Sequence, residues 1–257
     1  MLNAFQNIAI VAAIIFASIA FLWGLQIVWP NDRRRPHNDL IGWQVTVLGT
    51  TYAVIVGFML YTVWTEFQMA DGNAEAEANC LVNLARLAEG FSAGQRLEVQ
   101  NLARGYVDTM LADEWPAMNR LSFSPESHRI IQELWATMTR VEAHNASEQT
   151  NLDHALTELS DMTMHRRLRE LQAISSLPGI LWAVLIVGAV ATIVSACLFG
   201  SADFRLHLVQ VAMLAAILSL ALVAIADINR PFQGAVHVSP TGFIQAREAL
   251  NDLKAQH

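Results

Sequence analysis

Four long apolar runs, each without a charged residue, dominate the hydropathy pattern of the chain. They are Ile8–Val28, Trp43–Trp64, Ile180–Phe199 and Leu206–Ala226. A helix rises 1.5 Å per residue, so roughly 20 residues cross a hydrocarbon core of about 30 Å. Backbone polar groups in lipid have to be satisfied within their own segment, which favours helices over strands. The pattern therefore predicts four transmembrane helices.

The connections between these runs differ greatly in length. Short polar loops join the first run to the second and the third run to the fourth, whereas a long polar segment separates the two pairs. We therefore predict an all-α membrane protein, with four transmembrane helices in two hairpins and an inserted helical extramembrane domain. The predicted parts are a first hairpin over 1–65, the helical domain over 66–178, a second hairpin over 179–230, and a C-terminal turn and amphipathic helix over 231–257.

The polar segment shows helical periodicity and no sustained two-residue alternation. Its first helix is expected to continue from the second span. Ser124-Pro125-Glu126 is a typical helix start, with a capping serine and proline at the first helical position. The last helix is expected to bury a row of leucines. These leucines are Leu152, Leu156, Leu159, Leu168 and Leu171.

Composition and charge narrow the function classes. Of the 257 residues, 54% are apolar and 15% are charged, and the net charge is -7. So apolar a chain is not disordered, and its negative charge argues against nucleic-acid binding. Two cysteines cannot form a disulfide framework. The residues 66–178 hold 17 of the 23 acidic and 9 of the 16 basic side chains, so the negative charge belongs to the polar domain.

Acidic residues follow the exit of the second span, and no Lys or Arg occurs after them before Arg86. They are Glu66, Asp71, Glu75 and Glu77. If several copies surround the second span, these acids would form rings at a pore mouth, and such rings attract cations. The alternative is a solvated helix face with acids near a helix start.

A second polar pattern lies on the last helix of the domain. His154, Glu158, Asp161 and His165 fall at positions i, i+4, i+7 and i+11, which is one helical stripe. Such side chains can bind zinc or iron, but a single helix supplies a line of ligands and not a cage. A solvated charged face is the alternative interpretation. We expect no resident metal, no cofactor and no catalytic residue, so the chain is not expected to be an enzyme.

The segment after the fourth span carries a distinctive motif. Asp227, Arg230, Pro231, Phe232 and Gly234 combine a helix stop with a turn, and Asp227 and Arg230 have the spacing of an ion pair. This motif resembles the end of the bacterial bestrophin-like family of membrane proteins. The segment Glu75-Ala76-Glu77-Ala78, with the leucines that follow it, is similar to a second marked segment of that family.

The resemblance implies an ion channel. Bestrophins are pentameric anion channels whose second span lines the pore and whose helical domain is cytosolic, which implies a homo-oligomer conducting anions such as chloride. The implied location is the bacterial inner membrane, with the lipid bilayer and small inorganic ions as partners. The acidic calcium clasp of animal bestrophins is not recognisable. Candidate pore-lining residues are Tyr52, Ile55, Phe58, Met59 and Thr62.

Several alternatives stay open at this stage. The acidic exit of the second span suggests a cation-selective channel, and a non-conducting scaffold or sensor with a partner-binding domain is a further class. The histidine–acid stripe is the basis of an enzyme interpretation. The sidedness is open too, because Arg33-Arg34-Arg35 in the first short loop favours cytoplasmic loops, whereas the resemblance places the domain in the cytoplasm.

Overall fold

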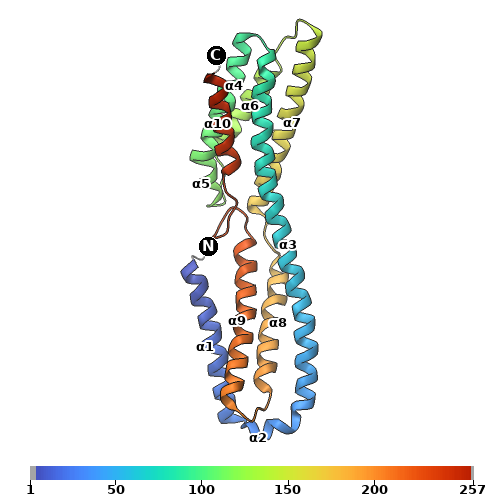
Figure 1. Ribbon diagram of the computed structural model, residues 1–257, viewed down its shortest axis with the longest axis vertical. Helices are drawn as coiled ribbons and strands as arrows, with labels where there is room; N and C mark the ends of the chain where they lie inside the picture. Colours follow the sequence, from blue (N-terminus) through green and yellow to red (C-terminus); the bar gives the residue numbers. More distant parts are fainter. Residues whose placement is uncertain (1–3, 256–257) are drawn as a thin grey trace. The chain divides into compact units, whose positions relative to one another are not determined.

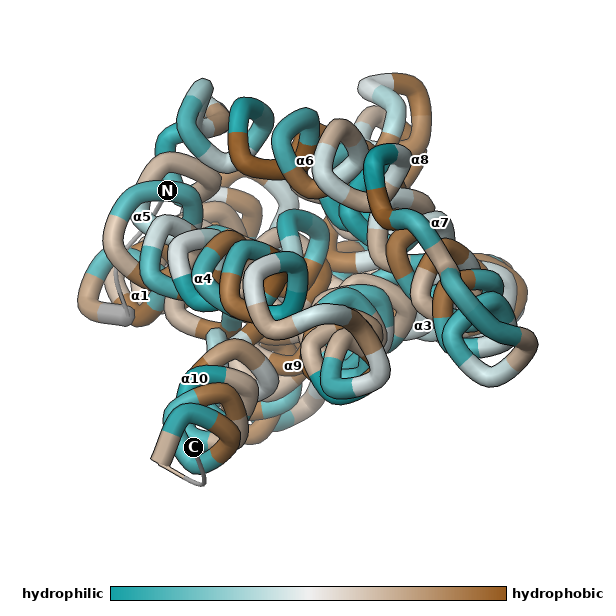
Figure 2. The backbone as a smooth tube through the Cα atoms, turned by 90° about the horizontal axis from the view of Figure 1, so that it is seen from above, coloured by the Kyte–Doolittle hydropathy of each residue, from teal (hydrophilic) through white to brown (hydrophobic). Residues whose placement is uncertain are grey.

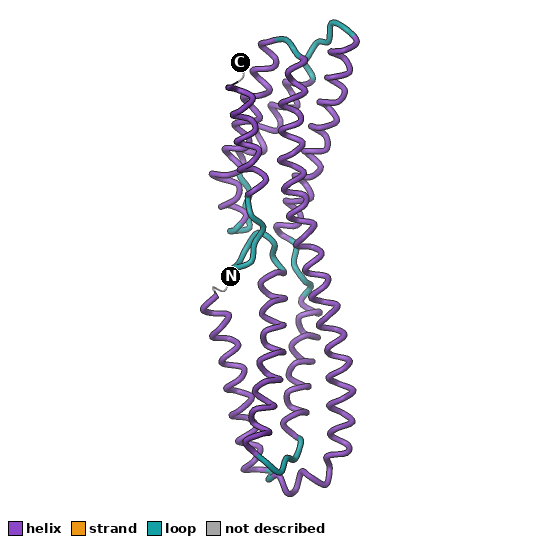
Figure 3. The backbone as a smooth tube through the Cα atoms, in the orientation of Figure 1, coloured by secondary structure: helices purple, strands orange, loops and turns teal. Residues whose placement is uncertain are grey.

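The computed structural model describes residues 4–255, and over this range it contains helices and loops without a strand (Figure 3). Four of the helices are long and apolar enough to cross a membrane. This confirms the predicted all-α membrane protein. The chain divides into two compact units. The first comprises the residues up to Thr65 together with Ser176–Asn229, and the second comprises Glu66–Ser175 together with the residues from Arg230 onward.

The first unit contains three complete apolar helices and the first part of a fourth helix (Figure 1). The complete helices are α1 (Ala4–Val28), α8 (Gly179–Leu198) and α9 (Phe204–Ile228). They pack on one another around Leu22, Ile193 and Val211. Many other apolar side chains on these helices are exposed, as expected for surfaces that face lipid or another subunit.

The short α2 (Asn31–Arg34) and the 3-10 turn η1 (Arg35–His37) form the loop after α1. The Arg34 side chain is fully buried there. Its guanidinium donates to Cys197 O at 2.6 Å, to Gln26 Oε1 at 2.7 Å and to Asn31 Oδ1 at 2.6 Å. Because Cys197 lies in the last turn of α8, the cation meets the negative end of that helix dipole. Arg34 thus ties the first loop to α8.

The helix α3 (Asn38–Leu87) has 50 residues and belongs to both units, which confirms that the second span continues into the polar domain. In the first unit it packs closely on α8. The Tyr52 hydroxyl donates to Leu185 O at 2.8 Å, and a Cβ on Gly188 would lie 2.4 Å from the Tyr52 ring. Glycine at 188 therefore permits the close approach of these two helices.

In the second unit, the remainder of α3 joins α4 (Ala93–Thr109), α6 (Pro125–Met138), α7 (Ala146–Ile174) and α10 (Thr241–Ala255). The short elements are η2 (Ala88–Gly90), the π-helical turn η3 (Met110–Glu114) and α5 (Trp115–Met118). Both α4 and α10 carry hydrophilic and hydrophobic residues in each turn (Figure 2), as expected of amphipathic helices. The apolar face of α10 is buried in the core of this unit.

The buried face of α7 differs from the predicted row of leucines. Leu168 and Leu171 are exposed, whereas Arg166 and Arg169 occupy buried positions. The buried positions follow a regular alternation of three and four residues along the helix. They are Leu152, Ala155, Leu159, Met162, Arg166, Arg169 and Ala173. The prediction was wrong at the end of the helix because two arginines there find partners inside the domain: Arg169 has buried carboxylates, and Arg166 has Glu170 and the backbone of Ser127.

The contact at Gly188 gives a test of the packing. Tyr52 is held by its hydroxyl and cannot withdraw easily, so Gly188→Ala should overpack the α3–α8 contact and destabilise the protein by about 1–3 kcal/mol. The matched control is Gly24→Ala in α1, where a Cβ meets nothing within 4 Å. The control should gain up to about 1 kcal/mol from helix propensity. Thermal unfolding of the purified protein in detergent measures both variants, and equal midpoints would contradict the packing.

Candidate functional site

One face of α3 stays exposed along most of the helix. Its members recur at intervals of three or four residues, or of a sum of these, so they share one side of a continuous helix. Within the span this face carries hydroxyl groups, small residues and aromatic rings, and beyond the span it carries amides and acids. The exposed members are Thr46, Thr50, Gly57, Tyr61, Trp64, Gln68, Asp71 and Glu75.

Most of the predicted pore-lining residues lie away from this face. Tyr52 is only 4% exposed and packs on α8, whereas Ile55 and Met59 are half-buried against a core formed by Val63 and Leu185. These side chains pack within the subunit, so they are unsuited to line a pore.

The remaining two predicted pore-lining residues are more accessible. Phe58 is 65% exposed, at the edge of the exposed face. Thr62 is half-buried, and its hydroxyl donates to Phe58 O at 2.9 Å, one turn earlier in the same helix. Phe58 therefore stays compatible with a pore-lining position, whereas the hydroxyl of Thr62 is already bound to the backbone.

The four predicted pore-mouth acids separate into two groups. Glu66, Asp71 and Glu75 are exposed. Glu77 is fully buried inside the second unit, where it pairs with Arg169 of α7. The expectation for Glu77 is thus corrected: its charge is compensated within the domain, and it cannot belong to an exposed ring of acids.

The Glu77 carboxylate is the centre of a buried polar network. Arg169 Nε donates to Glu77 Oε2 at 2.6 Å, and Arg169 Nη2 donates to Glu77 Oε1 at 3.3 Å. The Tyr106 hydroxyl of α4 donates to the same Glu77 Oε1. All three side chains are fully buried, so three helices meet at one charged cluster. Such a cluster is stable only when each charge is paired and hydrogen-bonded.

A second buried carboxylate, Glu114, belongs to the same network. Its Oε2 accepts from the backbone N–H of Ser124 at 2.6 Å and from the Ser127 hydroxyl at 3.1 Å. Its Oε1 accepts no hydrogen bond and lies 3.5 Å from Arg169 Nη1. The neighbouring Arg166 donates to Ser127 O at 2.9 Å and pairs with Glu170 at 2.8 Å. Two arginines and three carboxylates thus connect α3, η3, α6 and α7.

The surroundings of Tyr106 and Arg169 raise the pKa of both side chains. Burial, followed by the negative charge of Glu77, raises the pKa of Tyr106 well above its ordinary value, so the phenol keeps its proton and donates. For Arg169, burial is the largest influence and opposes the charged form, but the combined interactions with Glu77, Tyr106 and Glu114 outweigh it and raise the pKa. The network therefore holds a cationic Arg169 and a neutral Tyr106 at physiological pH.

The sequence prediction missed Arg169, Tyr106 and Glu114. One signal was present: Arg166 and Arg169 continue the spacing of Leu159 and Met162, which places them on the buried side of α7. A helical pattern alone does not identify this register, because the leucines at 168 and 171 compete for the same face. The positions of the partners on α3 and η3 come only from the folded chain.

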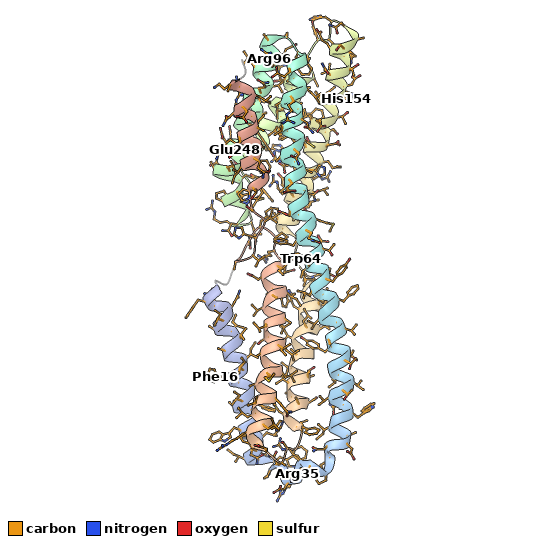
Figure 4. The ribbon with its side chains drawn as sticks, viewed as in Figure 1. Phe16, Arg35, Trp64, Arg96, His154 and Glu248 are labelled. Atoms are coloured by element: carbon orange, nitrogen blue, oxygen red, sulfur yellow. The ribbon has the colours of Figure 1, made fainter. Side chains whose placement is uncertain are left out.

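The histidine–acid stripe of α7 does not converge on one point. His154 is exposed on the outer side of the helix (Figure 4), whereas His165 Nδ1 lies 2.9 Å from Asn73 Oδ1 of α3. Glu158 Oε1 accepts from Asn83 at 3.4 Å, and Asp161 is exposed. Among residues 4–255, no three His, Cys, Asp or Glu side chains are grouped so that they could hold a metal ion.

The motif after α9 forms a compact turn in the second unit. Pro231, Phe232 and Gln233 are buried, and Val238 N donates to Pro231 O at 2.7 Å. Gly234 has a φ of 93°, which favours glycine. The Phe232 ring meets the Trp115 ring edge-on, with centroids 5.6 Å apart.

Arg230 has a hydrogen-bond partner within the turn that the motif forms. Its guanidinium donates to Gln233 Oε1 at 3.4 Å within the second unit. The pairing of Arg230 with Asp227 stays a prediction.

Comparisons with known proteins agree with the motif. A family model, the bestrophin-like domain, matches residues 11–243. Two structures of a bacterial bestrophin homolog from Klebsiella pneumoniae are similar, each with a TM-score of 0.71 and 12% identity. One, a point mutant, covers 95% of this chain and 98% of its own, and the other, phased on zinc, covers 96% and 99%. No curated protein sequence matches.

At 12% identity the structural matches show the fold, and the family model covers most of the sequence itself. The resemblance seen in the terminal motif is thereby confirmed. This all-helical membrane protein belongs to the bestrophin-like family.

Proposed function

We propose that the protein is an ion channel in which several copies surround a pore lined by the exposed face of α3. One observation carries the proposal: α3 is the least apolar of the four candidate spans, and its hydroxyl-bearing side chains at Thr50 and Tyr61 are exposed in the subunit. Polar groups on spans ordinarily face a bundle interior or a water-filled pathway, because lipid cannot satisfy them. A single exposed face encloses nothing, so the proposal requires a homo-oligomer.

The family supports both the activity and the assembly. Similar solved structures are described as bacterial bestrophin homologs, and bestrophins are pentameric channels. A pentamer in the bacterial inner membrane is accordingly part of the proposal.

The exposed charges favour cations as the permeating ions. From Trp43 to Asn83 the exposed face of α3 carries no Lys or Arg, whereas Asp71 and Glu75 are exposed on it. Repeated around an axis, these carboxylates would form rings that attract cations and repel anions. Anion conduction, which the resemblance to bestrophins implies, is the competing proposal, and the sign of the reversal potential decides between them.

Cysteine accessibility tests the lining face. In a background with Cys80→Ala and Cys197→Ala, Thr50→Cys and Gly57→Cys should each react with a charged methanethiosulfonate reagent, and the current should fall because the added group obstructs the pore. Met59→Cys is the matched control, since Met59 packs within the subunit only two residues from Gly57. Equal inhibition at Gly57 and Met59 in planar bilayers would contradict the assignment of this face.

Charge neutralisation tests the ion preference. Glu75→Gln should shift the reversal potential in a salt gradient toward the value for a non-selective pore, because a ring of charge biases permeation. Glu126→Gln is the control, since Glu126 is an exposed acid of the same domain that pairs with Arg129 on α6. A reversal potential that stays the same in Glu75→Gln would remove this residue from the conduction pathway.

A further inference from the structure

We propose that Arg169 is a two-position latch that exchanges between Glu77 and Glu114, and that this exchange moves Trp115 against Phe232. The latch is a device for gating, and that part of the proposal rests on the proposed channel function. The movement itself is a property of the helical domain, and it can be tested without an electrical measurement.

Arg169 is hydrogen-bonded to one of its two neighbouring carboxylates and not to the other. Glu77 receives two hydrogen bonds, from Nε at 2.6 Å and from Nη2 at 3.3 Å, whereas Glu114 receives none. Nη1 is directed instead to the sulfur of Met118 at 2.8 Å, a weak acceptor. Glu114 Oε1 is buried without a hydrogen bond. A small movement of the Arg169 guanidinium toward Glu114 would supply that hydrogen bond, because Nη1 already lies 3.5 Å away.

Glu114 is the last residue of a turn whose hydrogen-bond register differs from that of an α-helix. The η3 turn, Met110–Glu114, is π-helical between two α-helices, α4 and α5. A π-turn holds one extra residue relative to an α-helix, and such turns are frequent at functional sites. Conversion of this turn to α geometry would rotate every residue that follows it, beginning with Trp115. A change at the Glu114 carboxylate is therefore coupled to the orientation of Trp115 through the backbone.

Trp115 has both a partner that would respond and room to move. Its ring meets Phe232 of the family motif edge-on, and its indole N–H donates to Val238 O at 3.3 Å. A cavity of about 270 Å³ lies beside these groups, bordered by Leu111, Trp115, Phe232 and Gly234. This space is adjacent to the indole ring, so a rotated ring can enter it while exchanging its edge-on contacts with Phe232 and Phe243.

The latch acts on segments that are covalently continuous with three membrane helices. Glu77 lies on α3, which contains the second span, and Arg169 lies on α7, which ends five residues before Gly179 opens α8. Phe232 follows the end of α9 at Ile228 by four residues. An exchange of the Arg169 contact therefore alters the attachment points of three spans at once, which is the requirement for a gate controlled by the domain.

Two charge-neutralising variants should each favour one of the two positions of Arg169. Glu114→Gln weakens the alternative partner and should hold Arg169 on Glu77, whereas Glu77→Gln should favour Glu114. Hydrogen exchange of the full chain in detergent is measured by mass spectrometry over 110–118 and 230–238. Exchange in both segments should slow in Glu114→Gln and accelerate in Glu77→Gln, by roughly fivefold or more, as expected for coupling between sites. Glu126→Gln is the control and should change neither segment.

A milder variant keeps the test decisive if loss of a buried charge prevents folding. Ser127→Ala removes the hydroxyl that holds Glu114 Oε2 at 3.1 Å, so it should free Glu114 and accelerate exchange in both segments. Independent responses of the two segments, or shifts in the same direction in Glu77→Gln and Glu114→Gln, would overturn the latch.

Single-channel recording separates this proposal from the channel proposal. The open probability should change in opposite directions in the two glutamine variants, with unit conductance and reversal potential constant. An unchanged open probability in conducting variants would overturn the gating role. If the wild type carries no current in any salt, the channel proposal fails, and the paired exchange response would still support the latch.

Discussion

The buried guanidinium of Arg169 is the constraint on which the helical domain depends. A cation removed from water costs several kcal/mol unless charges and hydrogen bonds replace its hydration. Glu77 of α3 supplies the charge, Tyr106 of α4 satisfies the same carboxylate, and Glu114 contributes further negative charge from η3. Since the side chains come from separate helices, the pairing fixes the rotation of each helix about its own axis.

The rotation of α3 is the consequence that bears on function. Glu77 and Tyr52 both belong to α3, and one lies in each unit. Glu77 is bound to Arg169 in the domain, and Tyr52 is bound to Leu185 O of α8 in the membrane unit. Within each unit, one polar contact thus turns one side of α3 inward and leaves the opposite side exposed. Thr50, Gly57 and Glu75 are on that exposed side.

The membrane unit uses polar contacts in the same way. Arg34 donates to the carbonyl of Cys197 in the last turn of α8, and Asn38 exchanges two hydrogen bonds of 2.8 Å with the backbone of Gly200. Arg35, which follows Arg34 in the sequence, is exposed at this end of the unit (Figure 4). In a low-dielectric environment a hydrogen bond to an otherwise unpaired carbonyl is specific, because the alternative is an unsatisfied group. Apolar packing alone would permit many rotations of each helix about its own axis.

The sequence alone determined the class of the protein. The four apolar runs, the acidic middle and the motif from Asp227 to Gly234 were sufficient for the membrane fold and the family, because length, hydropathy and local turn chemistry do not depend on distant residues. The tertiary structure decided which side of each helix is buried. Glu77 and Glu75 differ by two positions and look alike in sequence, but only Glu77 meets an arginine 92 residues away. The same holds for Tyr52, whose burial follows from α8, so the exposed face of α3 could be assigned only after long-range partners were known.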